Sequence, residues 1–200
     1  MVAVDGVNII TKKTKYFLIY FLIVISKFIY GIKVNQNQLY LYITPTKLLH
    51  NLTFLKYNSV SSFNSLVDIV VVDNIAITAT RFEISYIFWN ITYEYRMGIK
   101  LFTDGLKTVY SISNFYKSSI WLEREVWDMF GIKFLFHFGL RRILTDYGFK
   151  GYPLRKDFPL LGYVDVYYDD SIQSIKVVPL ELAQSLRFFK FENPWNKWYL

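Results

Sequence analysis

Apolar and polar positions alternate and then recur at helical spacing just after the N-terminal region. Gln38–Ile43 (QLYLYI) alternates in part, which predicts a short strand. Thr44 then offers an N-cap, and Pro45 suits the first position of a helix. The leucines that follow predict an amphipathic helix over residues 45–57, and they are Leu48, Leu49, Leu52 and Leu55.

β-branched and aromatic residues dominate the next part of the chain. Ser65–Val72 is bounded by polar turns and predicts a strand, while Thr80–Trp89 and Ile91–Phe102 predict a hairpin. A further strand is expected over Lys107–Ser113. A strand, a helix and then a meander of strands predict an α+β fold, in which an antiparallel or mixed sheet carries helices on one face.

The apolar run Tyr16–Ile32 fits two different structures. It contains Lys27 and lies at the lower edge of the roughly 20 residues that a membrane-spanning helix needs. Because a charge is costly in mid-bilayer, the sequence favours a helix packed into a core or against a partner. No small-residue cleavage site and no Arg-rich, Ser-rich presequence accompany the basic residues before the run, which are Lys12, Lys13 and Lys15.

Composition narrows the possible chemistry. The absence of cysteine excludes disulfides, Cys-ligated iron–sulfur clusters and Cys-based zinc sites. Only His50 and His137 supply imidazole, so a self-contained transition-metal centre is disfavoured. The formal net charge of +7 predicts an acidic partner, which a protein, a nucleic acid or an anionic membrane would each provide. Tyr and Phe far outnumber Ala, a bias typical of very AT-rich genomes such as those of organelles.

The segment 121–162 concentrates the polar chemistry of the chain, beginning with a helix. Ser119 is expected to cap a helix over Ile120–Phe130, and Gly131 to end it in the left-handed conformation. A glycosidase-type acid/base pair requires two carboxyls facing a cleft about 5–9.5 Å apart. Acids interleaved with an arginine are more simply an ion-paired surface, which is the favoured interpretation here. The residues concerned are Glu123, Arg124, Glu125 and Asp128.

A basic loop follows this helix. Arg141 and Arg142 precede two glycine turns, and the prolines at 153 and 159 hold residues 154–157 out of helix. Guanidinium groups on such a restricted loop can bind carboxylates of a partner. Phosphate binding is the competing interpretation, but no glycine-rich turn leads into a helix N-terminus here. The charged residues of the second part are Arg155, Lys156 and Asp157.

The same segment resembles the signature of the 30-kilodalton subunit of respiratory complex I, a family with mitochondrial and bacterial members. The resemblance continues through LTDYGFKGYPLRKDFPLLGY and, more weakly, extends from Leu48 to the C-terminus. Phe138 and Tyr152 depart from it, because the family usually has Pro and His at these positions. The signature residues are Glu123, Arg124, Glu125, Asp128, Met129, Phe130, His137, Arg141, Ile143 and Leu144.

The resemblance implies a role without redox chemistry in this chain. In that family the subunit belongs to the peripheral arm of NADH:ubiquinone oxidoreductase and resembles a clamp on the large quinone-module subunit, near the subunit that carries the terminal iron–sulfur cluster. It implies no cofactor here, since NADH, FMN, iron–sulfur clusters and ubiquinone serve the complex that couples NADH oxidation to proton translocation. The implied location is the matrix side of the mitochondrial inner membrane, with membrane association only through the complex.

The C-terminal region is expected to bind a partner. The chain is divided into an apolar helix region (1–36), an α+β domain (37–162) and an extended tail (163–200). Gly162–Asp170 and Ser174–Val178 predict an exposed hairpin, and the aromatic end of the chain is expected to dock rather than fold back over its own sheet. The predicted interface residues are therefore Glu123, Arg124, Glu125, Asp128, Arg141, Arg142, Arg155, Lys156, Asp157, Phe188, Phe189, Trp195 and Trp198.

Two alternatives remain beside this assignment. A basic, aromatic chain can bind single-stranded nucleic acid by stacking within a positive groove. The positive charges are nevertheless dispersed along the sequence, and no recognised nucleic-acid motif is present, so no nucleic-acid partner is expected. The other alternative keeps the family but places it in a plastid or bacterial NAD(P)H dehydrogenase.

Overall fold

The computed structural model describes residues 3–5, 12–35, 38–76, 80–181, 184–185, 187 and 189, with side chains from residue 15 onward. Two units make up the chain, Met1–Phe158 and Pro159–Leu200. The boundary between them falls a few residues before the tail expected from the sequence, at the Phe158-Pro159 peptide.

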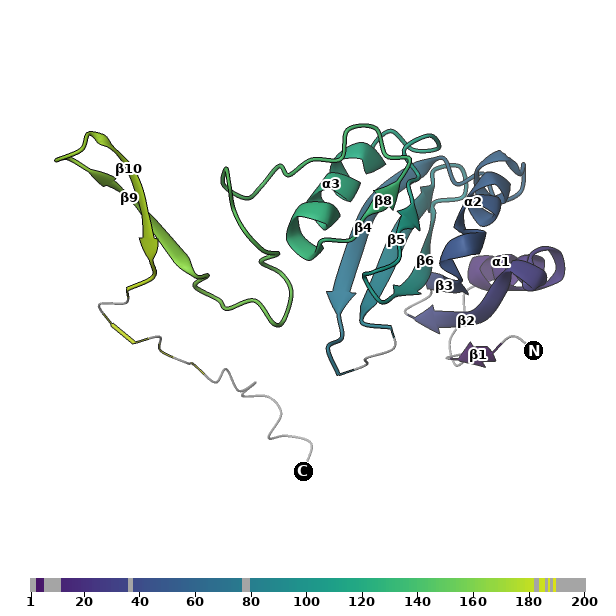
Figure 1. Cartoon of the computed structure of the whole chain (residues 1–200). Helices are drawn as coiled ribbons and strands as arrows, with labels where there is room; N and C mark the ends of the chain where they lie inside the picture. Colours follow the sequence, from purple (N-terminus) through teal and green to yellow (C-terminus); the bar gives the residue numbers. More distant parts are fainter. Residues whose placement is uncertain are drawn as a thin grey trace, which may run out of the picture. The chain divides into compact units, whose positions relative to one another are not determined.

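A mixed six-stranded sheet organises the first unit, in the order β1-β2-β3-β6-β5-β4 (Figure 1). The pairs β1–β2 and β3–β6 are parallel, and the other neighbours are antiparallel. Because β4 is last in the order, it forms one edge of the sheet. The strands are β1 (Ala3–Asp5), β2 (Ile29–Asn35), β3 (Gln38–Ile43), β4 (Ser65–Asp73), β5 (Phe82–Asn90) and β6 (Tyr95–Thr103).

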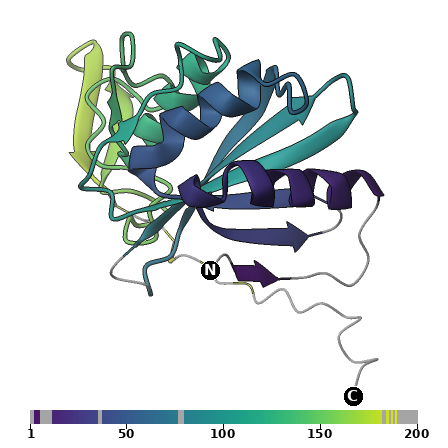
Figure 2. The same ribbon diagram turned by 90° about the vertical axis from the view of Figure 1, so that its right-hand side faces the viewer.

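Helices cover one face of this sheet. Figure 2 shows α1 and α2 side by side in front of the strands. Phe17 of α1 stacks on Tyr95 of β6 at 4.9 Å, and Phe130 of α3 meets Phe82 of β5 at 6.3 Å, so both helices lie over the same side of the pleat. The helices are α1 (Lys12–Val24), α2 (Leu48–Tyr57) and α3 (Ser119–Phe130), with 3₁₀ turns at Ser26–Phe28 and Pro45–Lys47.

Alternation along the strands produces the core. The helix-facing positions of β5 are almost fully buried, and they are Phe82, Ile84, Tyr86 and Phe88. The positions between them face the other side, where Glu83 pairs with Lys100 of β6. The expected α+β fold with helices on one face is therefore confirmed.

The N-terminal apolar run is a helix only in its first part. α1 ends at Val24, and residues 29–35 form β2, which pairs with β3 inside the sheet. Phe17 and Phe21 are buried in the core, as expected for the packed helix rather than the membrane span. Among the described residues, no helix has both the length and the apolarity to cross a bilayer. The described part of residues 1–36 thus packs with the rest of its unit.

Three local expectations differ from the structure. Thr44 makes no side-chain cap bond, because the first turn after it is a 3₁₀ turn and the α-helix starts at Leu48. Ser119 lies inside α3, where its hydroxyl donates to the Tyr116 carbonyl at 2.8 Å. The strand expected over residues 107–113 is reduced to β7 (Val109–Tyr110), which pairs in parallel with β8 (Phe134–Leu135), because the chain after it turns toward α3.

The second unit contains the expected hairpin. β9 (Val164–Asp169) pairs with β10 (Ser174–Pro179) in an antiparallel register. Apolar side chains of both strands are largely exposed in the described structure, including Val166, Tyr168, Ile175 and Val177. A two-stranded hairpin without a buried face is marginally stable by itself.

Candidate partner-docking site

The end of α3 fixes where the basic loop begins. Gly131 ends the helix with φ of +75°, and its N–H donates to the Trp127 carbonyl at 2.9 Å. A Cβ at this position would lie 2.6 Å from atoms of both Arg155 and Tyr152. Glycine is therefore required here both for the left-handed backbone and for the close approach of the loop.

Asp128 anchors the loop to α3 from inside the fold. Its carboxylate accepts backbone N–H bonds from Ile143, Leu144 and Thr145 at 3.1, 2.7 and 2.9 Å, and a bond from the Thr145 hydroxyl at 2.7 Å. Arg142 lies 3.5 Å away. Burial by itself raises the pKa of the Asp128 carboxyl, but these hydrogen bonds outweigh it and lower the pKa below the usual value.

Glu123, on the same helix, is buried in a different environment. One carboxylate oxygen accepts the Ser111 hydroxyl at 2.6 Å, and the other accepts the Ile112 N–H at 2.8 Å. Burial raises the pKa of Glu123 to about 7, although the hydrogen bonds oppose the shift. This carboxyl therefore changes charge near neutral pH.

His137 lies beside Glu123 without forming a stable ion pair. The ring Nε2 is 3.8 Å from the Glu123 carboxylate and 3.1 Å from the Ile120 carbonyl, and the side chain is fully buried. Burial lowers the pKa of His137, so the neutral ring donates from Nε2 to that carbonyl. Burial disfavours the charged form of both groups, which weakens any ion pair between them.

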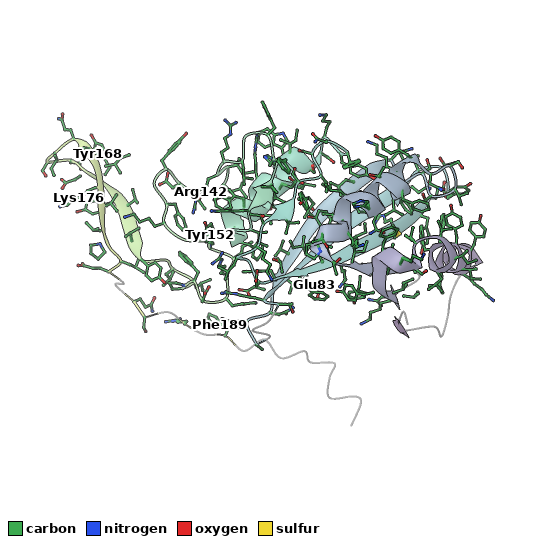
Figure 3. All side chains as sticks on the ribbon, turned by 45° about the vertical axis from the view of Figure 1, so that its right-hand side comes forward. Glu83, Arg142, Tyr152, Tyr168, Lys176 and Phe189 are labelled. Carbon is green, nitrogen blue, oxygen red and sulfur yellow. The ribbon has the colours of Figure 1, made fainter. Side chains whose placement is uncertain are left out.

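Arginines hold the loop through carbonyl oxygens. Arg124 donates from Nε to the Gly139 carbonyl at 3.0 Å, and Arg142 donates from Nη2 to the Gly151 carbonyl at 3.0 Å. Arg155 donates to the Phe130 carbonyl at 2.6 Å. This carbonyl lies at the C-terminal end of α3, where the helix dipole favours a positive charge. Figure 3 shows Arg142 and Tyr152 close together, and the guanidinium lies 5.1 Å from the ring centroid.

Arg81 joins two strands to the same loop. It forms two bonds of 2.7 Å with the Asp73 carboxylate and also contacts Asp157 at 3.0 Å. The backbone N–H of Lys156 donates to Asp73 at 2.8 Å. The Arg81 bonds lower the pKa of both carboxyls below the usual value, even though burial opposes the shift. The sequence did not predict this role, because Asp157 lies 76 residues from Arg81 in the chain.

The predicted interface residues separate into buried and exposed groups. The side chains of Glu123 and Asp128 are fully buried, so the expected ion-paired surface is wrong for these two residues. Arg124 is also buried, and its bonds run to backbone carbonyls rather than to neighbouring acids. Arg142 and Arg155 are partly buried, while the remaining residues of this unit are exposed, namely Glu125, Arg141, Lys156 and Asp157. Phe189 is exposed, and Phe188, Trp195 and Trp198 lie outside the described residues.

The anchored loop presents large side chains outward. Phe136, Phe138, Leu144 and Tyr147 are all exposed, and Tyr147 is completely so. Exposed Arg141 and Lys150 add positive charge to the same loop. No group of three or more His, Asp or Glu residues suited to a metal ion occurs among the described residues. The described part of the loop thus presents an aromatic and basic surface.

Comparison with known protein families shows to which family this chain belongs. The family model described as "Respiratory-chain NADH dehydrogenase, 30 Kd subunit" matches residues 41–164. This chain belongs to that family. The match covers the sheet from β3 onward, α3 and the anchored loop, so the assignment of the sequence to the 30-kilodalton subunit, which is a core part of the peripheral arm of complex I, is confirmed.

Relatives within the 30-kilodalton family match nearly the whole chain. NADH-ubiquinone oxidoreductase subunit 9 of Acanthamoeba castellanii is 43% identical over 196 residues, which span 96% of this chain and 98% of the relative. NADH dehydrogenase [ubiquinone] iron-sulfur protein 3 of Oryza sativa subsp. japonica is 40% identical, over 86% of this chain and 90% of the relative.

A solved structure resembles the fold of this 30-kilodalton subunit. A chain from the membrane-bound sulfane sulfur reductase, an archaeal respiratory membrane complex, has a TM-score of 0.64 and 23% identity. The likeness covers 75% of this chain and 88% of that one, and it concerns the fold alone.

Proposed function

We propose that this chain is a redox-inactive docking subunit, which supplies shape and fixed charge while other subunits oxidise NADH and reduce the quinone. The observation that carries the proposal is that polar side chains in residues 121–157 form hydrogen bonds within the chain. Glu123, Arg124 and Asp128 make their hydrogen bonds inside the chain and hold a loop that exposes aromatic and basic side chains. A preorganised loop of this kind loses little conformational entropy on binding.

The cofactors of the complex belong, in this proposal, to other subunits. The sequence contains no cysteine to bind an iron–sulfur cluster. The two carboxylates best placed for proton chemistry, Glu123 and Asp128, have buried side chains engaged in bonds within the chain. NADH, FMN, iron–sulfur clusters and ubiquinone would therefore react elsewhere in the complex.

The proposed partners are the large quinone-module subunit and the subunit that carries the terminal iron–sulfur cluster. The exposed apolar strands of the β9–β10 hairpin and the aromatic loop supply two surfaces of the type that protein interfaces use. The proposed location is the matrix side of the mitochondrial inner membrane, where the chain associates with the membrane only through these partners.

A matched pair of charge reversals tests the docking loop. Arg141→Glu changes an exposed side chain of the loop, whereas the control Lys33→Glu changes an exposed side chain of β2. Native electrophoresis of detergent-solubilised membranes, with an NADH-dehydrogenase activity stain and mass spectrometry, measures incorporation. We expect the Arg141 variant to be depleted from the active band about tenfold, as for loss of a charged interface anchor. Equal incorporation of both variants would contradict the docking role of the loop.

A further inference from the structure

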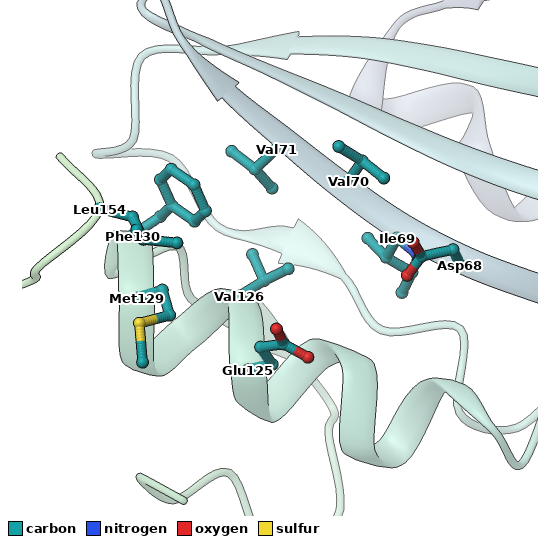
Figure 4. Close-up of a pocket in the computed structure, with 9 residues that line it drawn as sticks. All are labelled: Asp68, Ile69, Val70, Val71, Glu125, Val126, Met129, Phe130 and Leu154. Atoms are coloured by element: carbon teal, nitrogen blue, oxygen red, sulfur yellow. The ribbon is translucent and has the colours of Figure 1, made fainter. Parts of the chain in front are cut away.

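A groove runs along the free edge of the sheet, between β4 and α3. Figure 4 shows the strand and the helix on its two sides, with Phe130 directed toward β4. The groove has a volume of about 220 Å³. Asp68, Ile69 and Val71 line it from the strand, and Glu125 and Met129 line it from the helix.

The backbone of β4 offers hydrogen-bonding groups to this groove. Asn74 donates its N–H to the Arg81 carbonyl at 2.8 Å, which continues the register in which Asp73 faces Phe82. Bonded and non-bonded pairs alternate along an antiparallel ladder, so Val72 and Val70 also bond to β5. The N–H and C=O groups of the residues between them, including Val71, therefore point away from β5 and toward the groove.

Other parts of the chain close the two ends of the edge and leave its middle open. The Ser118 hydroxyl donates to the Leu66 carbonyl at 3.4 Å, and the backbone N–H of Lys156 donates to the Asp73 carboxylate at 2.8 Å. Asp68 accepts the N–H of Ile69 at 2.8 Å. The groups that remain directed at the groove are the carbonyls of Ile69 and Val71 and the N–H of Val71.

The middle of this edge lacks the usual protection against pairing. Natural edge strands are blunted by Lys, by Pro, by bulges or by a covering element. Residues 69–72 (IVVV) contain no charged residue and no Pro, and both Asp68 and the β-bulge between Leu66 and Asp68 lie before this open part. Such an edge is a template for an additional strand.

We propose that this groove binds an extended segment of another subunit of the complex, which adds a strand to β4. Main-chain bonds to Ile69 and Val71 would supply affinity, as in other cases of strand addition beside a helix. Apolar side chains of the segment would contact Met129 and Phe130, and a basic side chain would lie between Asp68 and Glu125. The inference rests on the proposed function, since the occupant is a neighbour in the same assembly.

Charge complementarity selects a basic segment. The chain as a whole carries a formal net charge of +7, yet the groove is flanked by two carboxylates. Within the described part of the chain, neither Asp68 nor Glu125 takes part in an ion pair. A lysine or arginine of the incoming segment would satisfy both.

Hydrogen exchange tests the main-chain part of the proposal. The purified complex is compared with the isolated full chain, and deuterium uptake is followed in peptides that contain Val71. We expect exchange there to be at least about tenfold slower in the complex, because an amide paired in a ladder exchanges only on local opening. Unchanged exchange in the complex would overturn strand addition.

Photo-cross-linking identifies the occupant. A photo-reactive amino acid replaces Met129 in the groove and, as a matched control, exposed Glu94 in the turn between β5 and β6. We expect the Met129 position to give one product with an extended, basic segment of another subunit, and the Glu94 position not to give it. A product with a helix, a product with a second copy of this chain, or no product from an incorporated variant would each overturn the proposal.

Failure of this inference is distinguishable from failure of the proposed function. If the unmodified chain does not co-migrate with the NADH-oxidising complex, the proposed function is wrong and so is the inference. If it co-migrates but the groove is neither protected nor cross-linked as expected, only the inference is wrong.

Discussion

Glu123 and Asp128 show how one short helix gives two carboxylates opposite properties. Asp128 accepts four hydrogen bonds from the loop, which stabilise its charged form. Glu123 accepts fewer bonds from described residues and is dominated by burial, which favours its neutral form. Asp128 thus acts as a charged anchor for the loop, whereas Glu123 is a buried acid that gains its charge only near neutral pH.

Replacing Asp128 should loosen the loop and destabilise the first unit. Asp128→Ala leaves three backbone N–H groups without their acceptor, and we expect a loss of about 2–4 kcal/mol in the free energy of unfolding. Because the folded-state pKa is lowered from 3.8, the stability that Asp128 contributes is present above pH 3.8 and is lost as the pH falls through the folded-state value.

Urea unfolding followed by tryptophan fluorescence measures this effect, with Asp146→Ala as the control on the exposed part of the same loop. The difference between Asp128→Ala and the wild type should shrink in acid. A difference that is equal at pH 6 and pH 3 would contradict the anchoring role of the charge.

Glu123 should give the opposite dependence on pH. Its folded-state pKa is raised from 4.5 to about 7, so the associated stability is fully present below pH 4.5 and is lost as the pH rises through 7. Glu123→Gln imitates the neutral acid at every pH. From pH 5 to pH 8 the wild type should lose about 1–3 kcal/mol relative to this variant, as measured by urea unfolding. Parallel pH profiles for the two proteins would show that Glu123 titrates normally.

At the scale of elements, Arg81 links β4, β5 and the end of the loop. Its guanidinium contacts Asp73 at the end of β4 and Asp157 in the loop. The side chain of Asp73 is only 1% exposed, so its charge depends on this partner. The geometry therefore makes the arginine fork, rather than positive charge alone, the link between the three elements.

Replacing Arg81 by alanine should destabilise the first unit more than replacing it by lysine. Arg81→Ala leaves the Asp73 carboxylate buried and unpaired, and we expect a loss of about 3 kcal/mol in the free energy of unfolding. Arg81→Lys keeps one charged contact and should lose about half as much. Denaturant unfolding of both variants measures the difference, and equal stability of the two would argue against a role for the bidentate geometry.

At the scale of the whole molecule, the described core belongs to one of the two units. The buried core of the described structure lies in Met1–Phe158, while the β9–β10 hairpin exposes apolar residues on both strands. A partner that covered these side chains would stabilise the second unit.

Truncation of the C-terminal residues tests stability and partner docking separately. A chain without residues 187–200 should keep the free energy of unfolding of the full chain within about 0.5 kcal/mol, because the described core does not include these residues. It should nevertheless be absent from the active band in native electrophoresis. Normal incorporation of the truncated chain would show that the tail does not dock.

The sequence by itself determined several of the elements and the family. Partial alternation predicted β3, β-branched and aromatic residues predicted β4 and the β5–β6 hairpin, and Gly131 marked the end of α3, since these signals are local to a few neighbouring residues. The signature in residues 123–144 identified the family for the same reason, because it is a pattern of residue types in linear order.

Only the tertiary structure decided where the charged side chains of that signature lie. The apolar run of residues 16–32 was divided into α1 and the start of β2 by pairing with β3, and Glu123 and Asp128 were turned inward by loops that follow or precede α3. The ion pair between Arg81 and Asp157 was likewise decided by the tertiary structure. Hydrogen-bond partners far apart in the chain are selected by burial and packing, which no local periodicity records.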